Sequence, residues 1–149
     1  MDKSQSSAFA LPDQTRRSIP IALLRARERV MSRFRPMLAK HGVTEQQWRV
    51  LRVVAESDAI DASELAHRAC ILAPSLTRIA KHLEDQAMIK RVRDAQDARR
   101  TRFDIAPAGL ALIDAMASER ETIYTAIEAE FGHERMENLL ELLEQLAEL

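Results

Sequence analysis

The chain has 149 residues, of which 46% are hydrophobic and 30% are charged. These values are typical of one globular domain and exclude wholesale disorder or collagen-like repetition. Three Gly and five Pro favour long helices over a turn-rich all-β fold, and a single Cys excludes an intramolecular disulfide. No apolar run suits a membrane span or a signal-peptide core, so we expect a cytoplasmic protein with no membrane partner.

The net charge of −1 hides an uneven distribution of charge along the chain. Residues 1–60 carry eleven Lys and Arg against six Asp and Glu, and residues 66–103 carry nine against four. Residues 107–149 carry two against ten. A basic region beside an acidic one indicates an anionic partner for one face, and an ordinary solvated surface is the alternative.

Hydrophobic periodicity predicts a mostly helical chain behind a mobile polar tail at residues 1–18. Helices are expected over residues 20–41, 44–56, 61–69, 74–86, 107–131 and 136–146. Short strands are expected at 88–93 and 101–105, joined by a polar loop. The predicted order is therefore α-α-α-α-β-β-α-α.

Local signals fix several of these boundaries. Thr44 begins a capping-box sequence that ends at Gln47, and Asp61 is placed as the N-cap of the next helix. Pro36 lies inside the first long helix, where a kink or a restart is expected. Gly42 and Gly132 are placed at helix ends.

Two short helices with a tight turn, followed by a hairpin with a basic loop, define a winged helix-turn-helix over residues 43–106. In this motif the second helix enters the major groove of double-stranded DNA and reads base edges with its N-terminal residues. The candidate reading residues on that helix are Pro74, Ser75, Thr77, Arg78 and Lys81. The candidate wing residues are Arg93, Asp97, Arg99 and Arg100. Arg at a hairpin tip suits the minor groove. Asp97 is expected to orient the Arg99 guanidinium or, alternatively, only to stiffen the turn.

Residues 21–146 resemble the MarR family of bacterial transcription factors. The resemblance is carried by the wing sequence Asp97-Ala98-Arg99-Arg100 and by Pro107-Ala108-Gly109. The strings 44–49 and 68–77 are similar to members that repress an aromatic-compound catabolic operon. Gln96 replaces an Arg that is common in the family, and Ala106 replaces a capping Thr.

The resemblance implies a homodimer that reads a pseudo-palindromic operator. The first and last helices, residues 19–42 and 107–149, would then be dimerisation helices, and closure of a monomer core is the alternative. The resemblance also implies release from DNA by a small aromatic acid, either of the hydroxyphenylacetate type or a hydroxylated pyridine carboxylate. The candidate ligand-binding residues are Arg17, Ser32, Phe34, His41, Trp48 and Arg49. Trp48 is alternatively a core residue, and Arg49 alternatively meets only solvent or Glu45.

The remaining features do not point to catalysis. The sequence has no phosphate-binding Gly-rich loop, no His-Glu-x-x-His and no Gly-x-Ser-x-Gly, so neither an enzyme nor a cofactor is expected. His67 and Cys70 alone do not complete a metal site. Cys70 is expected to be buried and inert, and a redox-sensing regulator that uses Cys70 is the alternative. A winged-helix module that binds proteins is a further alternative to a DNA-binding regulator.

Overall fold

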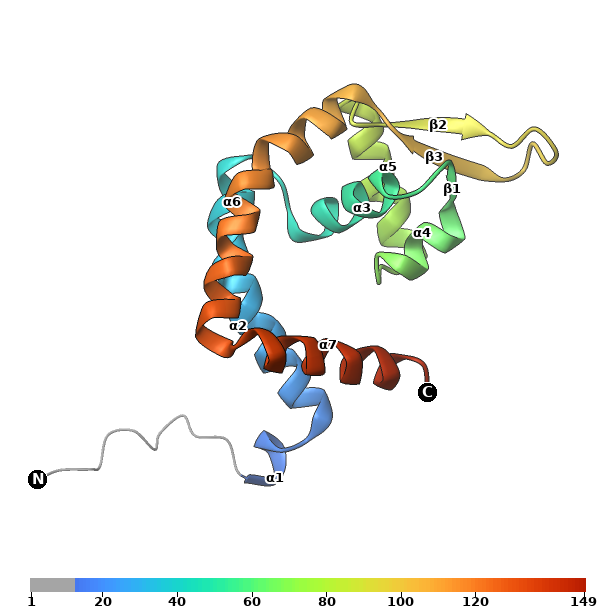
Figure 1. Ribbon diagram of the computed structural model, residues 1–149. Helices are drawn as coiled ribbons and strands as arrows, with labels where there is room; N and C mark the ends of the chain where they lie inside the picture. Colours follow the sequence, from blue (N-terminus) through green and yellow to red (C-terminus); the bar gives the residue numbers. More distant parts are fainter. Residues whose placement is uncertain (1–12) are drawn as a thin grey trace, which may run out of the picture. The chain divides into compact units, whose positions relative to one another are not determined.

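The computed structural model describes residues 13–149 (Figure 1). The helices are α1 (Asp13–Arg16), α2 (Ile19–Lys40), α3 (Glu45–Ala55), α4 (Ala62–Arg68), α5 (Ala73–Asp85), α6 (Pro107–Phe131) and α7 (His133–Ala147). The strands are β1 (Ile60–Asp61), β2 (Ile89–Arg93) and β3 (Thr101–Ile105). Contacts divide the described residues into two compact units, 13–34 and 35–149.

The predicted fold class is confirmed: helices dominate, and the strands form one small antiparallel sheet. The strand order is β1-β3-β2, and Phe103 of β3 pairs with Ile60 on one side and with Arg91 on the other. Strand β1 was not predicted, because two residues are too short to show alternation. Of the predicted tail, Asp13–Arg16 form α1, and residues 1–12 lie outside the described residues.

One hydrophobic core joins α3, α4 and α5 to the sheet. Each helix supplies residues at helical spacing, and the strands add Ile60, Ile89 and Phe103. The core residues of the helices are Val50, Leu51, Val54, Leu65, Leu76, Ile79, Ala80 and Leu83, together with Ala69 at the end of α4. Burial of each Leu, Ile or Val side chain stabilises the fold by about 1.5–3 kcal/mol. This core therefore fixes the position of α5 against the sheet.

The predicted helix caps are present. The Gln47 backbone N–H donates to Thr44 Oγ1, and the Thr44 backbone N–H donates to Gln47 Oε1, both at 3.1 Å. Asp61 Oδ1 accepts hydrogen bonds from the backbone N–H groups of Ser63 and Glu64. Each cap satisfies backbone donors that the first helical turn leaves open.

Of the kink or restart expected at Pro36, the restart is not found. Helix α2 runs unbroken through it to Lys40. Met37 and Leu38, just beyond the proline, are each only 2% exposed. Tertiary burial therefore holds this turn helical although Pro36 donates no backbone hydrogen bond.

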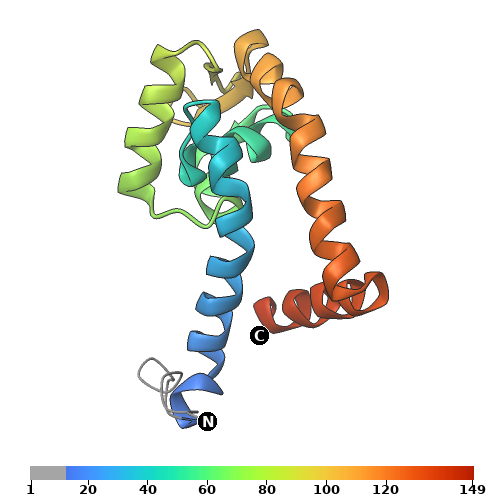
Figure 2. The ribbon, with the colours of Figure 1, turned by 90° about the vertical axis from the view of Figure 1, so that its left-hand side faces the viewer.

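The chain turns sharply at Gly132, between α6 and α7 (Figure 2). Gly132 has φ +104°, a conformation that side chains with a Cβ rarely adopt. The ring of His133 hydrogen-bonds the Glu128 carboxylate across this corner, and that bond raises the pKa of His133 above 6.5.

Gly109, the last residue of the Pro107-Ala108-Gly109 string, lies where α6 meets the first residues of the hairpin. A Cβ at Gly109 would lie 2.2 Å from the Met88 carbonyl oxygen and 2.7 Å from Ile105 Cδ1. The same Met88 oxygen accepts a hydrogen bond from the Ala106 N–H at 3.0 Å. Only glycine fits this approach between helix and strand.

Gly109→Ala is therefore expected to destabilise the fold although alanine is the better helix former. Overpacking costs about 1–3 kcal/mol, and the gain in helix propensity returns about 1 kcal/mol. We expect a net loss of up to about 2 kcal/mol in the free energy of unfolding, measured by urea denaturation. Ala111→Gly, at an exposed position of the same helix, isolates the propensity effect. A Gly109→Ala chain more stable than the native chain would contradict the close approach.

Candidate DNA-binding interface

The turn between α4 and α5 is closed by backbone hydrogen bonds. The Cys70 N–H donates to His67 O at 3.1 Å, and the Ile71 N–H donates to Ala66 O at 3.0 Å. Cys70 adopts φ +53°, which reverses the chain within one residue. Ile71 is buried directly after it. The turn therefore fixes the start of α5 against α4.

The expectation of a buried Cys70 is wrong. Its side chain is exposed. The neighbours Ala69 and Ile71 are both buried, so composition around the cysteine predicts burial. The left-handed backbone at Cys70 turns its side chain outward instead.

Helix α5 has one buried and one exposed face. Its apolar residues face the core, while Pro74, Thr77, Arg78 and Lys81 are exposed and Ser75 is half-buried. The helix begins without a side-chain cap, and its N-cap residue Leu72 is 79% exposed. The uncapped first turn presents backbone N–H groups and the positive end of the helix dipole to solvent, which favours an anionic group such as phosphate.

The exposed polar groups of α5 differ in their partners. Arg78 forms no ion pair with any residue from 13 to 149. Lys81 Nζ lies 3.9 Å from Asp85 Oδ2, a loose pair on the same helix. The Thr77 hydroxyl donates to the Ala73 carbonyl at 3.1 Å and keeps its acceptor capacity. Arg78 is thus available to an external acceptor.

The β2–β3 hairpin projects from the helices and ends in the loop of residues 94–100 (Figure 1). Asp97 Oδ1 accepts a hydrogen bond from the Arg99 backbone N–H at 3.0 Å, and the Arg100 N–H donates to Asp97 O. Asp97 therefore stiffens the turn, as the alternative interpretation had it, and does not hold the Arg99 guanidinium. Asp94 Oδ1 accepts the Gln96 N–H, which lowers the pKa of that carboxyl below 3.8.

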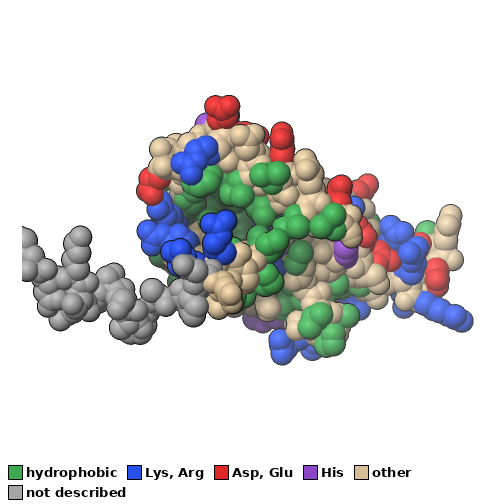
Figure 3. Space-filling view, turned by 90° about the horizontal axis from the view of Figure 1, so that it is seen from below, with side chains coloured by type: hydrophobic (Ala, Val, Ile, Leu, Met, Phe, Trp, Pro, Cys, Tyr) green, Lys and Arg blue, Asp and Glu red, His purple; other side chains and the backbone are tan. Residues whose placement is uncertain are grey.

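Basic side chains gather on this projecting loop, at the right of Figure 3. Arg93 and Arg99 are exposed and form no ion pair within the described part of the chain. Arg100 Nε instead lies 3.2 Å from Oδ2 of Asp61, the N-cap of α4. Arg91 forms a bidentate pair with Glu84 of α5, which raises the pKa of Arg91, and stacks on Phe103. Arg91 and Arg100 brace the wing, whereas Arg93 and Arg99 extend from it.

A second cluster surrounds Trp48 on α3. The Arg52 guanidinium lies 5.7 Å from the centre of the Trp48 ring, and that of Arg120 on α6 lies 6.0 Å away. Arg52 is also paired with Glu56. Arg120 Nη1 is buried and has no hydrogen-bond partner among the described residues. A buried guanidinium N–H without an acceptor is costly, so the cluster suits an anion beside an aromatic ring.

The structure does not bring all predicted ligand-binding residues together. Arg49 points away from Trp48, since Nη1 donates to the Cys70 carbonyl at 3.3 Å. His41 lies near Glu119, with Nε2 3.7 Å from Oε1 and no hydrogen bond. Arg17, Ser32 and Phe34 lie in the first compact unit, where Arg17 and Ser32 are exposed and Phe34 is buried.

Arg52 and Arg120 are not among the ligand-binding residues predicted from the sequence. Arg120 lies at helical spacing from the apolar residues Ala117 and Tyr124, which was a usable signal, because an isolated charge on a packed face needs a partner. Arg52 lies four residues after Trp48, one turn along α3. Their meeting with Trp48 depends on how α6 packs on α3, which local sequence does not specify.

The described residues offer little for other kinds of site. Among residues 13–149 no group of three His, Cys, Asp or Glu residues could hold a metal ion. No helix in that range has the length and apolar character needed to span a bilayer.

The fold and exposed groups define a winged helix-turn-helix protein. Residues 43–101 match the model of the MarR family. The homoprotocatechuate degradative operon repressor of Escherichia coli is 43% identical over 132 residues, which cover 89% of each chain. The regulator FarR of Neisseria gonorrhoeae is 39% identical, with 93% of this chain and 96% of FarR covered. The chain is also similar to NadR, whose crystal structure was solved in complex with 4-hydroxyphenylacetate. The two sequences are 39% identical, the TM-score is 0.82, and the match covers 93% of this chain and 99% of NadR.

These similarities extend over both the winged helix-turn-helix and the flanking helices, and they exceed what a shared fold alone would give. The chain belongs to the MarR family, whose members here are transcriptional regulators and not enzymes.

Proposed function

We propose that this protein is a homodimeric repressor that binds a pseudo-palindromic operator in double-stranded DNA and controls an operon for aromatic-compound catabolism. The observation that carries the proposal is the exposed start of α5 beside the wing, with Arg78, Arg93 and Arg99 unpaired among residues 13–149. The 43% identity of this chain to the homoprotocatechuate degradative operon repressor supports an operon for aromatic-compound catabolism as the target. Binding to an operator would place the protein in the cytoplasm.

In this proposal α5 lies in the major groove. Arg78 then donates two hydrogen bonds to one guanine, the pairing that best distinguishes a base pair there. Ser75, Thr77 and Lys81 surround it and contact bases or phosphates, while Pro74 and the uncapped turn approach the backbone. The packed core behind α5 fixes the positions of these side chains relative to one another.

The wing provides a second contact. Arg99 at the stiffened turn enters the minor groove, where the negative potential is strongest, and Arg93 follows the phosphate backbone. Arg100 keeps the loop against α4 through Asp61, and Asp97 fixes the turn. Two copies related by twofold symmetry then read half-sites spaced by about one helical turn, 10–10.5 bp.

Replacement of Arg99 by Ala tests the wing contact. Each phosphate charge neutralised by a cation contributes about one unit to the slope of log K against log salt, so we expect that slope to decrease by about one. Affinity should fall by a similar factor for all DNA sequences. Fluorescence anisotropy with specific and random duplexes over a salt series measures both effects.

Arg68→Ala is the matched control, because Arg68 is an exposed arginine on α4 that is paired with Glu64 and lies outside the proposed contact set. The control should leave the slope unchanged. An Arg99→Ala protein with the native slope would overturn the assignment of the wing to DNA.

The Trp48 cluster is the proposed receptor for the signal. The signal is a small hydroxylated aromatic acid, with a hydroxylated pyridine carboxylate as the rival, whose ring lies by Trp48 and whose carboxylate accepts from Arg120 Nη1. The similarity to NadR, solved with 4-hydroxyphenylacetate, supports the first class. Occupancy would release DNA by favouring a different spacing of the two α5 helices. His41 stays a proposed ligand-binding residue, whereas Arg49 donates to the Cys70 carbonyl and is not expected to contact the acid. Arg17, Ser32 and Phe34 of the first unit also stay proposed ligand-binding residues.

A further inference from the structure

Arg49 connects α3 to the turn at the start of α5. Its guanidinium donates through Nη1 to the Cys70 carbonyl at 3.3 Å. That carbonyl lies just past the C-terminal end of α4, where the partial negative charge of the helix end favours a cation. It also lies two residues before Leu72, the N-cap of α5. The hydrogen bond therefore attaches the start of α5 to α3.

Trp48 and Arg49 are neighbours on α3 but contact different elements. Trp48 lies beside Arg120 of α6, whereas Arg49 reaches the turn before α5. The next two residues, Val50 and Leu51, are both buried in the core. Because a closely packed core transmits a displacement, a shift of α3 at Trp48 also moves Arg49.

The hydrogen bonding of Arg49 is incomplete. Its Nε is buried and has no hydrogen-bond partner among residues 13–149. A buried donor without an acceptor is costly. A small shift of α3 that gave Nε an acceptor would therefore favour loss of the bond to the Cys70 carbonyl.

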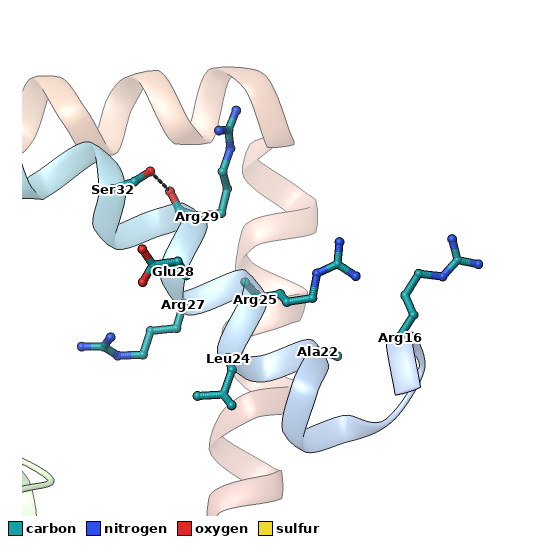
Figure 4. Close-up of a pocket in the computed structure, with 9 residues that line it drawn as sticks. Arg16, Ala22, Leu24, Arg25, Arg27, Glu28, Arg29 and Ser32 are labelled. Atoms are coloured by element: carbon teal, nitrogen blue, oxygen red, sulfur yellow. Dashed lines mark hydrogen bonds between the residues drawn. The ribbon is translucent and has the colours of Figure 1, made fainter. Parts of the chain in front are cut away.

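Two other predicted ligand-binding residues have no such contact with the turn. The Ser32 hydroxyl donates to the Arg29 carbonyl at 2.7 Å, within α2 itself (Figure 4). His41 Nε2 lies 3.7 Å from Glu119 of α6 and forms no hydrogen bond with a described residue. Of Ser32, His41 and Arg49, it is Arg49 that hydrogen-bonds the turn before α5.

We propose that Arg49 is the positioning residue that couples the acid site to DNA binding. Arg49 holds the turn before α5 in place when the Trp48 cluster is empty, and the acid breaks this hydrogen bond when it binds. The inference rests on the proposed function and names the contact through which the acid changes the position of α5. By linkage, the acid and the DNA weaken the binding of each other by the same factor.

Replacement of Arg49 by Gln in the full-length chain tests this coupling. Fluorescence anisotropy measures the affinity for a duplex selected from genomic DNA by the native chain, with and without saturating 4-hydroxyphenylacetate. The ratio of the two dissociation constants is the coupling factor, and for the native chain we expect about 5 to 150. Arg49→Gln should bind the duplex more weakly than the native chain, and the acid should change that affinity by less than about twofold.

Two further readouts separate coupling from a merely structural role. Titration of Trp48 fluorescence should show that Arg49→Gln binds the acid at least as tightly as the native chain, because no hydrogen bond has to break. The single Cys is exposed at the turn, so the rate of alkylation of its thiol reports on the turn. The acid should change that rate in the native chain and leave it unchanged in Arg49→Gln.

Arg49→Lys keeps a cationic donor and should keep part of the coupling factor. Arg68→Ala is the matched control, because Arg68 is an exposed arginine at the end of α4 that is paired with Glu64. It should keep the native factor.

A native coupling factor in Arg49→Gln would overturn the role of Arg49 and leave the acid-released repressor intact. So would an equal loss of coupling in Arg68→Ala, an alkylation rate in the native chain that the acid does not change, or loss of acid binding in Arg49→Gln. A native chain that binds the duplex equally well with and without the acid would contradict the proposed signal, and the coupling with it.

Discussion

Replacement of Arg78 by Ala is expected to reduce affinity for the specific operator by about 1–3 kcal/mol, roughly 5- to 150-fold, and to relax preference at one base pair of each half-site. The reason is geometric. Arg78 is exposed on the first turns of α5, forms no ion pair within residues 13–149, and is carried by a helix whose opposite face is fully packed. Its two-pronged guanidinium matches the acceptors of guanine.

Competition binding with duplexes substituted at each position measures this loss. Affinity for random DNA should fall little, which separates a base contact from a phosphate contact. Arg68→Ala again serves as the exposed arginine control. If Arg78→Ala weakened all sequences equally and kept the base preference, Arg78 would contact phosphate.

Arg120→Gln is expected to weaken binding of 4-hydroxyphenylacetate by about 10- to 150-fold, because a hydrogen bond to a buried charged group contributes about 1.5–3 kcal/mol. The chain has one Trp, so Trp48 fluorescence reports directly on the cluster. The native protein should show a saturable change in that fluorescence on addition of the acid. The neutral analogue 4-hydroxyphenylethanol, which lacks the carboxylate, should bind as weakly to the native protein as the acid does to the variant.

Arg49→Gln is the informative comparison for this site. Arg49 follows Trp48 in the sequence, but its guanidinium reaches the Cys70 carbonyl. It should therefore retain the fluorescence response to the acid. If Arg49→Gln lost the response and Arg120→Gln kept it, the acid would bind at Arg49, as the sequence predicted. That result would contradict a binding site formed by Trp48 and Arg120.

The winged fold was predictable because its local signals agree with its packing. Thr44 and Asp61 cap the helices that they were expected to cap, and Gly132 lies at the corner between α6 and α7. The features that could not be predicted depend on contacts between distant residues. Strand β1 exists only through pairing with β3, and α2 passes Pro36 because Met37 and Leu38 are buried.

The candidate site shows the same division. The position of α5 and of the wing follows from helix period and turn composition, and the residues predicted there are mostly exposed as expected. The exposure of Cys70 does not follow, since one left-handed residue reverses its direction. The contact between Trp48 and Arg120 could not be predicted from local sequence either. Arg120 is 72 positions away in the chain and reaches Trp48 only because α6 packs on α3.

Selection of bound genomic fragments, followed by fluorescence anisotropy on the best of them at fixed salt, tests whether the protein is a repressor that an aromatic acid releases from its operator. The DNA upstream of the protein's own gene is the first fragment to measure, with a panel of hydroxylated aromatic and pyridine acids added to the complex. We predict binding to a pseudo-palindromic duplex that is at least about a thousandfold tighter than to random DNA and that one acid of the panel abolishes. Binding that no acid disturbs would refute the proposed signal and return attention to the exposed Cys70. If no fragment bound more tightly than random DNA, the protein would not be an operator-binding repressor. A winged-helix module that binds proteins would then be the better interpretation.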